Sequence, residues 1–241
     1  MRKLLYLTLL FCLLVSACTP QATATPAPGT DSVEIAVSAA ASLTEAYTQI
    51  AQDFEILHPE IKVIFNFGGS QALAEQINNG APVDVFASAS KKTMQTVVDA
   101  GNISSEVVKQ FVSNKLVVIV PAGNPGQVVT LQDLTREGLK IVLAAKEVPV
   151  GQYSLDFFAK AAATSDFPPT YSDDIVRNVV SYEDNVKAVL TKVTLGEADA
   201  GIVYTTDAAS ADEGKIQTIE IPDEINIPAS YFIAMVKNSS H

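Results

Sequence analysis

Two serine side chains stand where an expected strand gives way to an expected helix, and a hydroxyl at such a turn can bind an anion. Ser42 opens a segment with helical apolar periodicity, and Ser70 follows the pair Gly68-Gly69. Glycines let the backbone approach a ligand closely, and the free amides of a helix start favour negative charge. Ser42 and Glu45 also have the spacing of a capping box, in which Glu45 would occupy the Ser42 amide and keep a ligand from it.

Neutral hydrogen-bond donors recur at the later turns of the chain. Residues 148–153 and 182–186 form two further helix starts, and Tyr204 ends an expected strand with a phenol, although a buried core tyrosine is the alternative. No lysine or arginine lies directly in these turns, and Lys187 only follows Val186. Hydroxyls, amides and a phenol suit a small, fully ionised oxyanion. They would reject an anion that still carries a proton, because that proton would meet no acceptor.

Catalytic and metal-binding arrangements are poorly supported by the sequence. The two histidines, His58 at an expected helix end and His241 at the last position, offer no credible Ser/His/Asp triad. The acidic pairs Asp173-Asp174 and Glu183-Asp184 are most simply solvated or capping residues. Residues 121–126 are rich in glycine and proline but lack the lysine of a nucleotide-binding loop. We therefore expect neither an enzyme nor a resident cofactor or metal ion.

Short apolar segments alternate with amphipathic ones from Val33 onward, which predicts an α/β fold with mostly parallel sheets flanked by helices. The predicted strands are residues 33–38, 62–67, 84–87, 116–120, 140–144, 175–181, 200–204, 216–221 and 231–236, and the predicted helices are residues 42–57, 70–79, 93–100, 153–163 and 184–195. The first helix has an apolar face that runs from Leu43 to Leu57. Two successive series of strand–helix units predict two lobes, residues 32–115 with 226–241 and residues 116–225.

The first residues of the chain have the features of an export signal. Arg2-Lys3 precede the apolar residues 4–15, a run too short to span a bilayer, and small residues follow. The segment Val15-Ser16-Ala17-Cys18 resembles a bacterial lipobox, so we expect residues 1–17 to be removed and Cys18 to carry the lipid; an ordinary signal peptide cut nearby is the alternative. Residues 18–31 have the composition of an extended tether. The protein is therefore expected to be exported and to meet a membrane only through that lipid.

The charge balance narrows the range of partners. The 241 residues include 16 basic and 27 acidic side chains, for a formal charge of −11. Binding a nucleic-acid backbone depends on clustered lysine and arginine, so this class of partner is disfavoured.

Several of these segments, taken in order, resemble the molybdate-binding proteins of bacterial ABC importers. The matching segments are AAASLTEA at residues 39–46, FGGSQALAEQI at 67–77, GAPVDVFASA at 80–89, VPVGQY at 148–153, YEDNVKAVL at 182–190 and GEADAGIVYTTDA at 196–208. The resemblance spans residues 33–237. It implies the type II periplasmic-binding-protein fold, with the oxyanion enclosed between two lobes joined by a hinge.

The same resemblance implies which residues contact the ligand. Ser42 and Ser70 would donate through hydroxyl and backbone, Val150 and Val186 through backbone N–H groups, and Tyr204 through its phenol. Molybdenum would be present only inside the bound oxyanion, with no direct protein ligand. The implied function is to bind molybdate or tungstate outside the cytoplasm, as a monomer, and to deliver it to an ABC permease and its ATPase.

Three departures from that family stand beside the resemblance. Val150 is bulkier than the alanine expected there, and Lys187 replaces a commoner arginine. The family also continues past the strand at residues 231–236 with a final helical segment. Because of this last departure, we expect the first lobe to be less stable. Two classes of function compete with molybdate transport. One is a binding protein for sulfate or another tetrahedral oxyanion, and the other is an enzyme or a membrane-linked oxyanion sensor on the same scaffold.

Overall fold

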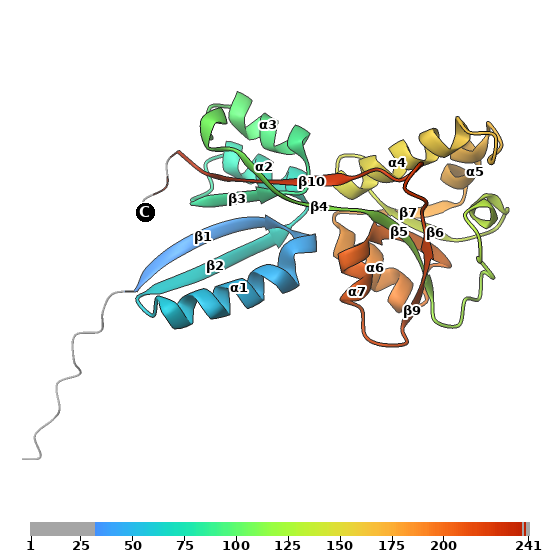
Figure 1. Cartoon of the computed structure of the whole chain (residues 1–241), viewed down its shortest axis with the longest axis horizontal. Helices are drawn as coiled ribbons and strands as arrows, with labels where there is room; N and C mark the ends of the chain where they lie inside the picture. Colours follow the sequence, from blue (N-terminus) through green and yellow to red (C-terminus); the bar gives the residue numbers. More distant parts are fainter. Residues whose placement is uncertain (1–31, 238, 240–241) are drawn as a thin grey trace, which may run out of the picture. The chain divides into compact units, whose positions relative to one another are not determined.

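The structure is a computed structural model that describes residues 32–237 and residue 239. The expected signal peptide, the lipid-bearing Cys18 and the tether at residues 18–31 lie outside the described residues. From Ser32 onward the chain forms two five-stranded sheets with helices packed on them (Figure 1). We call each sheet with its helices a lobe. The lobe boundaries at residues 32–115 with 226–241 and at residues 116–225 remain predictions.

The first sheet has the strand order β2–β1–β3–β10–β4. Its strands are β1 (Val33–Ala40), β2 (Ile61–Gly68), β3 (Val85–Ser88), β4 (Lys109–Asn114) and β10 (Ala229–Met235), and its helices are α1 (Thr44–Leu57), α2 (Ser70–Asn78) and α3 (Lys91–Asp99). Figure 1 shows α1 on one face of this sheet and α2 with α3 on the other. Phe86, Leu73 and Met94 are buried between the sheet and α2 and α3.

The second sheet has the order β7–β6–β8–β5–β9. Its strands are β5 (Leu116–Pro121), β6 (Ile141–Ala144), β7 (Val179–Glu183), β8 (Ala200–Tyr204) and β9 (Ile216–Glu220), and its helices are α4 (Pro149–Ala162), α5 (Tyr171–Arg177), α6 (Val186–Thr194) and α7 (Thr205–Ala209). Strands β5, β6 and β8 are buried throughout, as central strands covered by helices on both faces must be. Phe157, Phe158 and Tyr171 fill the space beneath α4 and α5.

The predicted fold class is confirmed, with one strand of opposite direction in each sheet. Strand β10 pairs antiparallel with both β3 and β4, and β5 pairs antiparallel with both β8 and β9, so the other four strands of each sheet share a direction. A helix begins within a few residues of the carboxyl ends of β1, β2, β6, β7 and β8. Ligands of open α/β sheets bind at such strand ends.

Two short segments connect the lobes, one between β4 and β5 at Lys115 and one just before β10. The buried side chain of Asn226 ties them together. Its amide oxygen accepts the Leu116 N–H at 3.1 Å, and its amide nitrogen donates to the carbonyls of Leu116 at 2.9 Å and Ile221 at 3.2 Å. The Lys160 ammonium also donates to the Asn226 carbonyl at 3.1 Å.

Some predicted elements were wrong. Residues 175–181 are not one strand, because helix α5 ends at Arg177 and strand β7 begins only at Val179. Helix α5 has Asp173 and Asp174 in its first turn and Arg177 in its last. At these positions each charge interacts favourably with the helix dipole. Arg177 also forms an ion pair with Asp174. The exposed strand β4, which lacks an apolar face, and the short helix α7 were not predicted.

The apolar face of α1 is less buried than its periodicity indicates. Of the helix itself only Ala51 is buried, while Ile50 is 60% exposed and Leu57 76%. This face borders a cavity of about 790 Å³ between α1 and the first sheet. Apolar side chains dominate the walls of this larger cavity, unlike the donor-lined wall that the sequence predicts around an anion.

Candidate functional site

The structure brings all five predicted contact residues to the wall of one small cavity. We call it the anion cavity, after the ligand that the sequence predicts; it lies between the two lobes and is small, with a volume of about 10 Å³. Its walls are formed by Ala40, Ala41, Ser42, Gly68, Gly69, Ser70, Ala89, Val148, Pro149, Val150, Asn185, Val186 and Tyr204. None of these residues carries a charge.

Three α-helices direct their N-termini at this cavity. Ser70 is the first residue of α2, Val186 is the first of α6, and Val150 is the second of α4 after Pro149. The first amides of a helix have no partner within it, and the helix dipole gives them partial positive charge. Because proline has no N–H, the Val150 amide is the first of α4 that can donate. Valine at position 150 therefore offers what alanine would offer, a backbone N–H.

Tyr204 supplies a buried phenol at the last position of β8. Its side chain is 1% exposed, and its hydroxyl has no hydrogen-bond partner among the described residues. Burial raises the pKa of Tyr204 well above its usual value, so the group keeps its proton and can donate. An unpaired buried hydroxyl costs about 1–3 kcal/mol, and its place in the cavity wall leaves this donor available to a ligand.

Ser42 does not form the capping box that its spacing with Glu45 suggests. A 3-10 turn at Ala41–Leu43 precedes α1, so Ser42 lies inside the first turn and Ala40 is the N-cap. The Ser42 hydroxyl lies 2.8 Å from the hydroxyl of Tyr231 on β10, and the Glu45 carboxylate binds Lys187 instead. Glu45 therefore leaves the Ser42 amide free of the side chain that was expected to occupy it.

Lys187 lies beside the anion cavity but does not line it. Its ammonium contacts both carboxylate oxygens of Glu45 at 2.8 Å, the Ser210 hydroxyl at 3.0 Å and the Asp207 carboxylate at 3.1 Å. Lys187 is on α6 and Glu45 is on α1, so this ion pair joins the two lobes. The positive charge of Lys187 is thus paired with carboxylates and does not line the cavity.

Asp207 makes the stability of the protein depend on pH. Its side chain is fully buried, and burial raises its pKa from the usual 3.8 to about 6, against the opposing effect of Lys187. The folded state therefore binds this proton more tightly than the unfolded chain does. The resulting stabilisation is complete below about pH 3.8 and is lost as the pH rises through about 6, a difference on the order of 3 kcal/mol.

We expect Asp207→Asn to remove this dependence. Glu55, Asp133 and Glu183 have lowered pKa values and act in the opposite direction, so the useful quantity is the difference in unfolding free energy between the native chain and the variant. Urea unfolding from pH 4 to 7 should show the variant gaining relative stability as the pH rises. A difference that stays constant over that range would contradict the assigned pKa.

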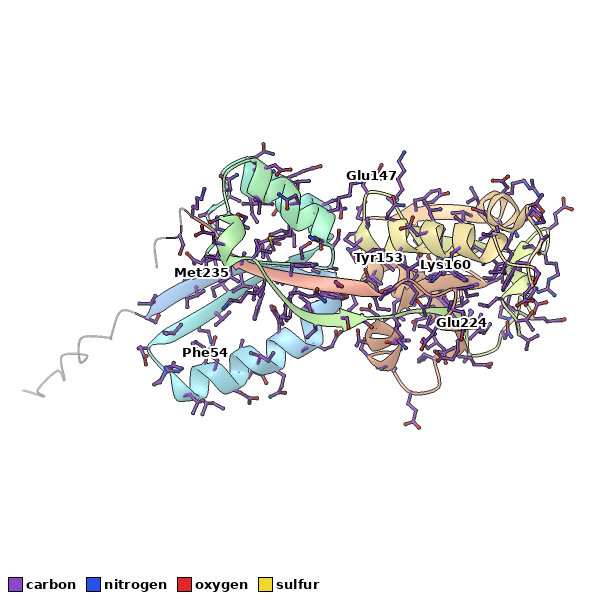
Figure 2. All side chains as sticks on the ribbon, turned by 45° about the horizontal axis from the view of Figure 1, so that its top comes forward. Phe54, Glu147, Tyr153, Lys160, Glu224 and Met235 are labelled. Atoms are coloured by element: carbon purple, nitrogen blue, oxygen red, sulfur yellow. The ribbon has the colours of Figure 1, made fainter. Side chains whose placement is uncertain are left out.

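Other contacts hold the lobes together around the anion cavity. The Tyr153 hydroxyl on α4 donates to the Ala89 carbonyl of the first lobe at 3.2 Å, and the Gln71 side chain donates to the Asp184 carbonyl at 3.4 Å. Figure 2 shows Tyr153 at the side of the second lobe that lies next to the first. No pattern in the sequence pointed to Tyr231, which contacts the Ser42 hydroxyl from the strand β10. Asn185 was identifiable as an N-cap, and its side chain accepts the Ala188 N–H at 3.0 Å.

The acidic pairs have structural partners in the second lobe. Glu183 accepts hydrogen bonds from Lys192 at 2.6 Å and from Ser181 at 2.5 Å, and Asp174 pairs with Arg177.

Within residues 32–237, no group of three histidine, cysteine or acidic side chains is arranged to hold a metal ion. Over the same residues, no helix combines the length and the hydropathy that a bilayer crossing requires.

Comparisons with known proteins agree with the geometry. Residues 35–241 match the sequence profile of a family described as bacterial extracellular solute-binding protein. The molybdate-binding protein ModA of Mycobacterium tuberculosis is 38% identical over 206 residues, which cover 86% of this chain and 74% of that protein. ModA of Escherichia coli is 30% identical over 217 residues, or 88% and 80% of the two chains. The periplasmic molybdate-binding protein of Azotobacter vinelandii superposes with a TM-score of 0.70 at 21% identity, covering 86% of this chain and 87% of that one.

Proposed function

Because this chain belongs to the bacterial extracellular solute-binding protein family, we propose that it captures molybdate, with tungstate as an equivalent guest, and delivers it to an ABC import permease and its ATPase. The family binds solutes and does not catalyse reactions. The observation that carries the proposal is a small cavity without charged walls, into which helix N-termini and hydroxyls from both lobes converge.

The chemistry of the walls selects the guest. A cation would find no carboxylate in the cavity, and a large organic solute would find no room. A doubly charged tetrahedral oxyanion accepts hydrogen bonds in all directions, and donors in a water-excluded site hold it more strongly than they would in water. Ser42 and Ser70 supply hydroxyls and amides, Val150 and Val186 supply amides, and Tyr204 supplies its phenol.

Binding would also favour the closed arrangement of the lobes. Ser42 and Ser70 belong to the first lobe, whereas Val150, Val186 and Tyr204 belong to the second. A guest that contacts both groups stabilises the form in which they converge and shifts the population towards it. A permease that recognises the closed form would thereby distinguish loaded from empty protein.

The place of action follows from the family and the first residues. Members of a bacterial extracellular solute-binding family act outside the cytoplasm. We propose that Cys18 carries a lipid that holds the protein at the outer face of a bacterial membrane, and that the protein acts as a monomer with no further membrane contact.

Thermal unfolding with three anions tests the proposed function. A guest that binds only the folded state stabilises it by about 2.7 kcal/mol at a concentration 100 times its Kd. We expect molybdate and tungstate to raise the Tm of the purified chain at concentrations where sulfate does not. Equal stabilisation by sulfate would assign the protein to sulfate-type oxyanions instead, and no effect of any anion would refute the proposal.

Tyr204→Phe tests the placement of the guest. The variant keeps the ring and removes one donor, so we expect molybdate binding to weaken by about 1–3 kcal/mol. Tyr182→Phe is the matched control, because Tyr182 lies on β7 of the same lobe and its side chain is half exposed, away from the cavity. Calorimetric titration that shows equal affinity in both variants would place the oxyanion elsewhere.

A further inference from the structure

One ion pair beside the anion cavity joins two turns that carry predicted contact residues from opposite lobes. Glu45 lies three residues after Ser42, in the first turn of α1, and Lys187 directly follows Val186 at the start of α6. The Lys187 ammonium contacts both oxygens of the Glu45 carboxylate at 2.8 Å. Figure 1 shows the start of α1 next to α6 and α7 of the other lobe. The pair therefore crosses the space that would widen if the lobes moved apart.

Resting on the proposed function, we propose that Glu45 and Lys187 are closure-positioning residues, whose ion pair holds the lobes around the bound oxyanion and slows its release. Neither side chain forms part of the wall of the anion cavity. The pair therefore acts on the guest through the arrangement of the lobes, without touching it.

Lys187 is held in place by its own lobe. Its ammonium lies 3.1 Å from the carboxylate of Asp207, which is on α7, and 3.0 Å from the hydroxyl of Ser210, which caps that helix. These contacts lie within the second lobe, so they persist when the lobes separate. Because the lysine side chain is already ordered by them, pairing with Glu45 on closure costs little conformational entropy at Lys187.

Glu45 has its partner only in the other lobe. Within residues 32–237, its carboxylate forms hydrogen bonds and an ion pair with Lys187 alone. Its side chain is 55% exposed even in this arrangement, so in an open form the carboxylate is left to water. The contact therefore stabilises the closed form and adds nothing to the open one. An ion pair of this exposure shifts an equilibrium by up to about fivefold, and its two-oxygen geometry within a network favours the upper part of that range.

The same helix supplies a matched control. Glu55 lies near the end of α1 and forms an ion pair with Lys62 on β2, so both partners belong to the first lobe. Glu55→Gln removes a carboxylate–lysine pair from α1 without changing any contact between the lobes. Glu45→Gln removes the pair that crosses between them.

The test measures the Kd of molybdate by calorimetry and its dissociation rate by stopped-flow tyrosine fluorescence. For Glu45→Gln we expect the Kd to rise by about two- to fivefold, mostly through faster dissociation, and for Glu55→Gln we expect native values. Glu45→Lys, which brings two ammonium groups together across the lobes, should weaken binding further. Urea unfolding without molybdate shows separately whether a substitution destabilises α1.

Salt distinguishes a closing ion pair from a general structural role of Glu45. Salt screens the guest equally in both proteins, but it weakens the partly exposed pair only where the pair exists. The ratio of the Glu45→Gln Kd to the native Kd should therefore fall towards one between about 20 mM and 500 mM NaCl. A structural defect would leave this ratio constant.

The possible failures are distinguishable. If the native chain binds molybdate but Glu45→Gln matches it in Kd and dissociation rate, or matches Glu55→Gln, the inference is overturned and the proposed function stands. A Kd ratio that does not change with salt also overturns the inference alone. A native chain that binds no molybdate overturns both.

Discussion

Replacing Gly69 by alanine is expected to weaken oxyanion binding by at least tenfold with little change in the stability of the first lobe. A methyl carbon added at Gly69 would lie well within 3.0 Å of the Asp184 carbonyl oxygen. Real Cβ atoms essentially never make contacts shorter than 3.0 Å. Asp184 belongs to the second lobe, so the clash is relieved when the lobes separate. Overpacking of this kind costs about 1–3 kcal/mol, and here the cost falls on the closed form.

Gly68→Ala is the matched control for this effect. A methyl group there would make ordinary contact with the flexible Leu73 side chain at 3.4 Å and would not touch the second lobe. Calorimetry should therefore show a large loss of molybdate affinity in Gly69→Ala and a small one in Gly68→Ala. Urea unfolding without ligand should place both variants near the native chain. Equal affinities of the two variants would show that closure does not require the contact at Gly69.

Gly151→Ala is expected to destabilise the second lobe itself. The added methyl group would overlap the carbonyl oxygens of Ala144 and Ala145, both of them backbone atoms of the same lobe. Neither can move without displacing β6 or the start of α4, so we expect a loss of unfolding free energy of about 3 kcal/mol or more. Because the first turn of α4 carries the Val150 amide, molybdate affinity should fall with it.

Urea unfolding of Gly151→Ala beside Gly123→Ala measures this loss. Gly123 lies in the turn after β5, where a methyl group would meet nothing within 4 Å and the backbone conformation suits alanine. The control should therefore unfold near the native midpoint. A Gly151→Ala variant as stable as the control would mean that the start of α4 has more freedom than the structure shows.

Local sequence patterns predicted most of the elements that carry the site. Ser42, Ser70 and Val186 sit at turns where strand periodicity changes to helical periodicity, and Tyr204 ends a predicted strand; such patterns are encoded within about ten residues. For the same reason the pattern around Asn185 identified a helix start. The ligand roles of these residues came from a resemblance and remain predictions.

Contacts between distant segments could not be predicted in this way. Tyr231 is 189 residues from Ser42, and the methyl-sized gap at Gly69 is closed by a carbonyl of the other lobe. Periodicity carries no information about such pairs. The capping box failed for a related reason: Glu45 had a second possible partner, Lys187, which lies 142 residues away in sequence. The local spacing predicted that Glu45 would accept the Ser42 amide, whereas the packing of the two lobes places Glu45 against Lys187.

The bonds of Asn226 determine how the two halves can move apart. Because this side chain fastens the start of β5 and the segment before β10 to the same lobe, each crossing has only a few residues on its other side, Lys115 in one and Ile227-Pro228 in the other. Proline fixes its own φ angle and restricts the residue before it, so few backbone torsions remain free. We therefore expect any opening of the two lobes to take place about these two segments.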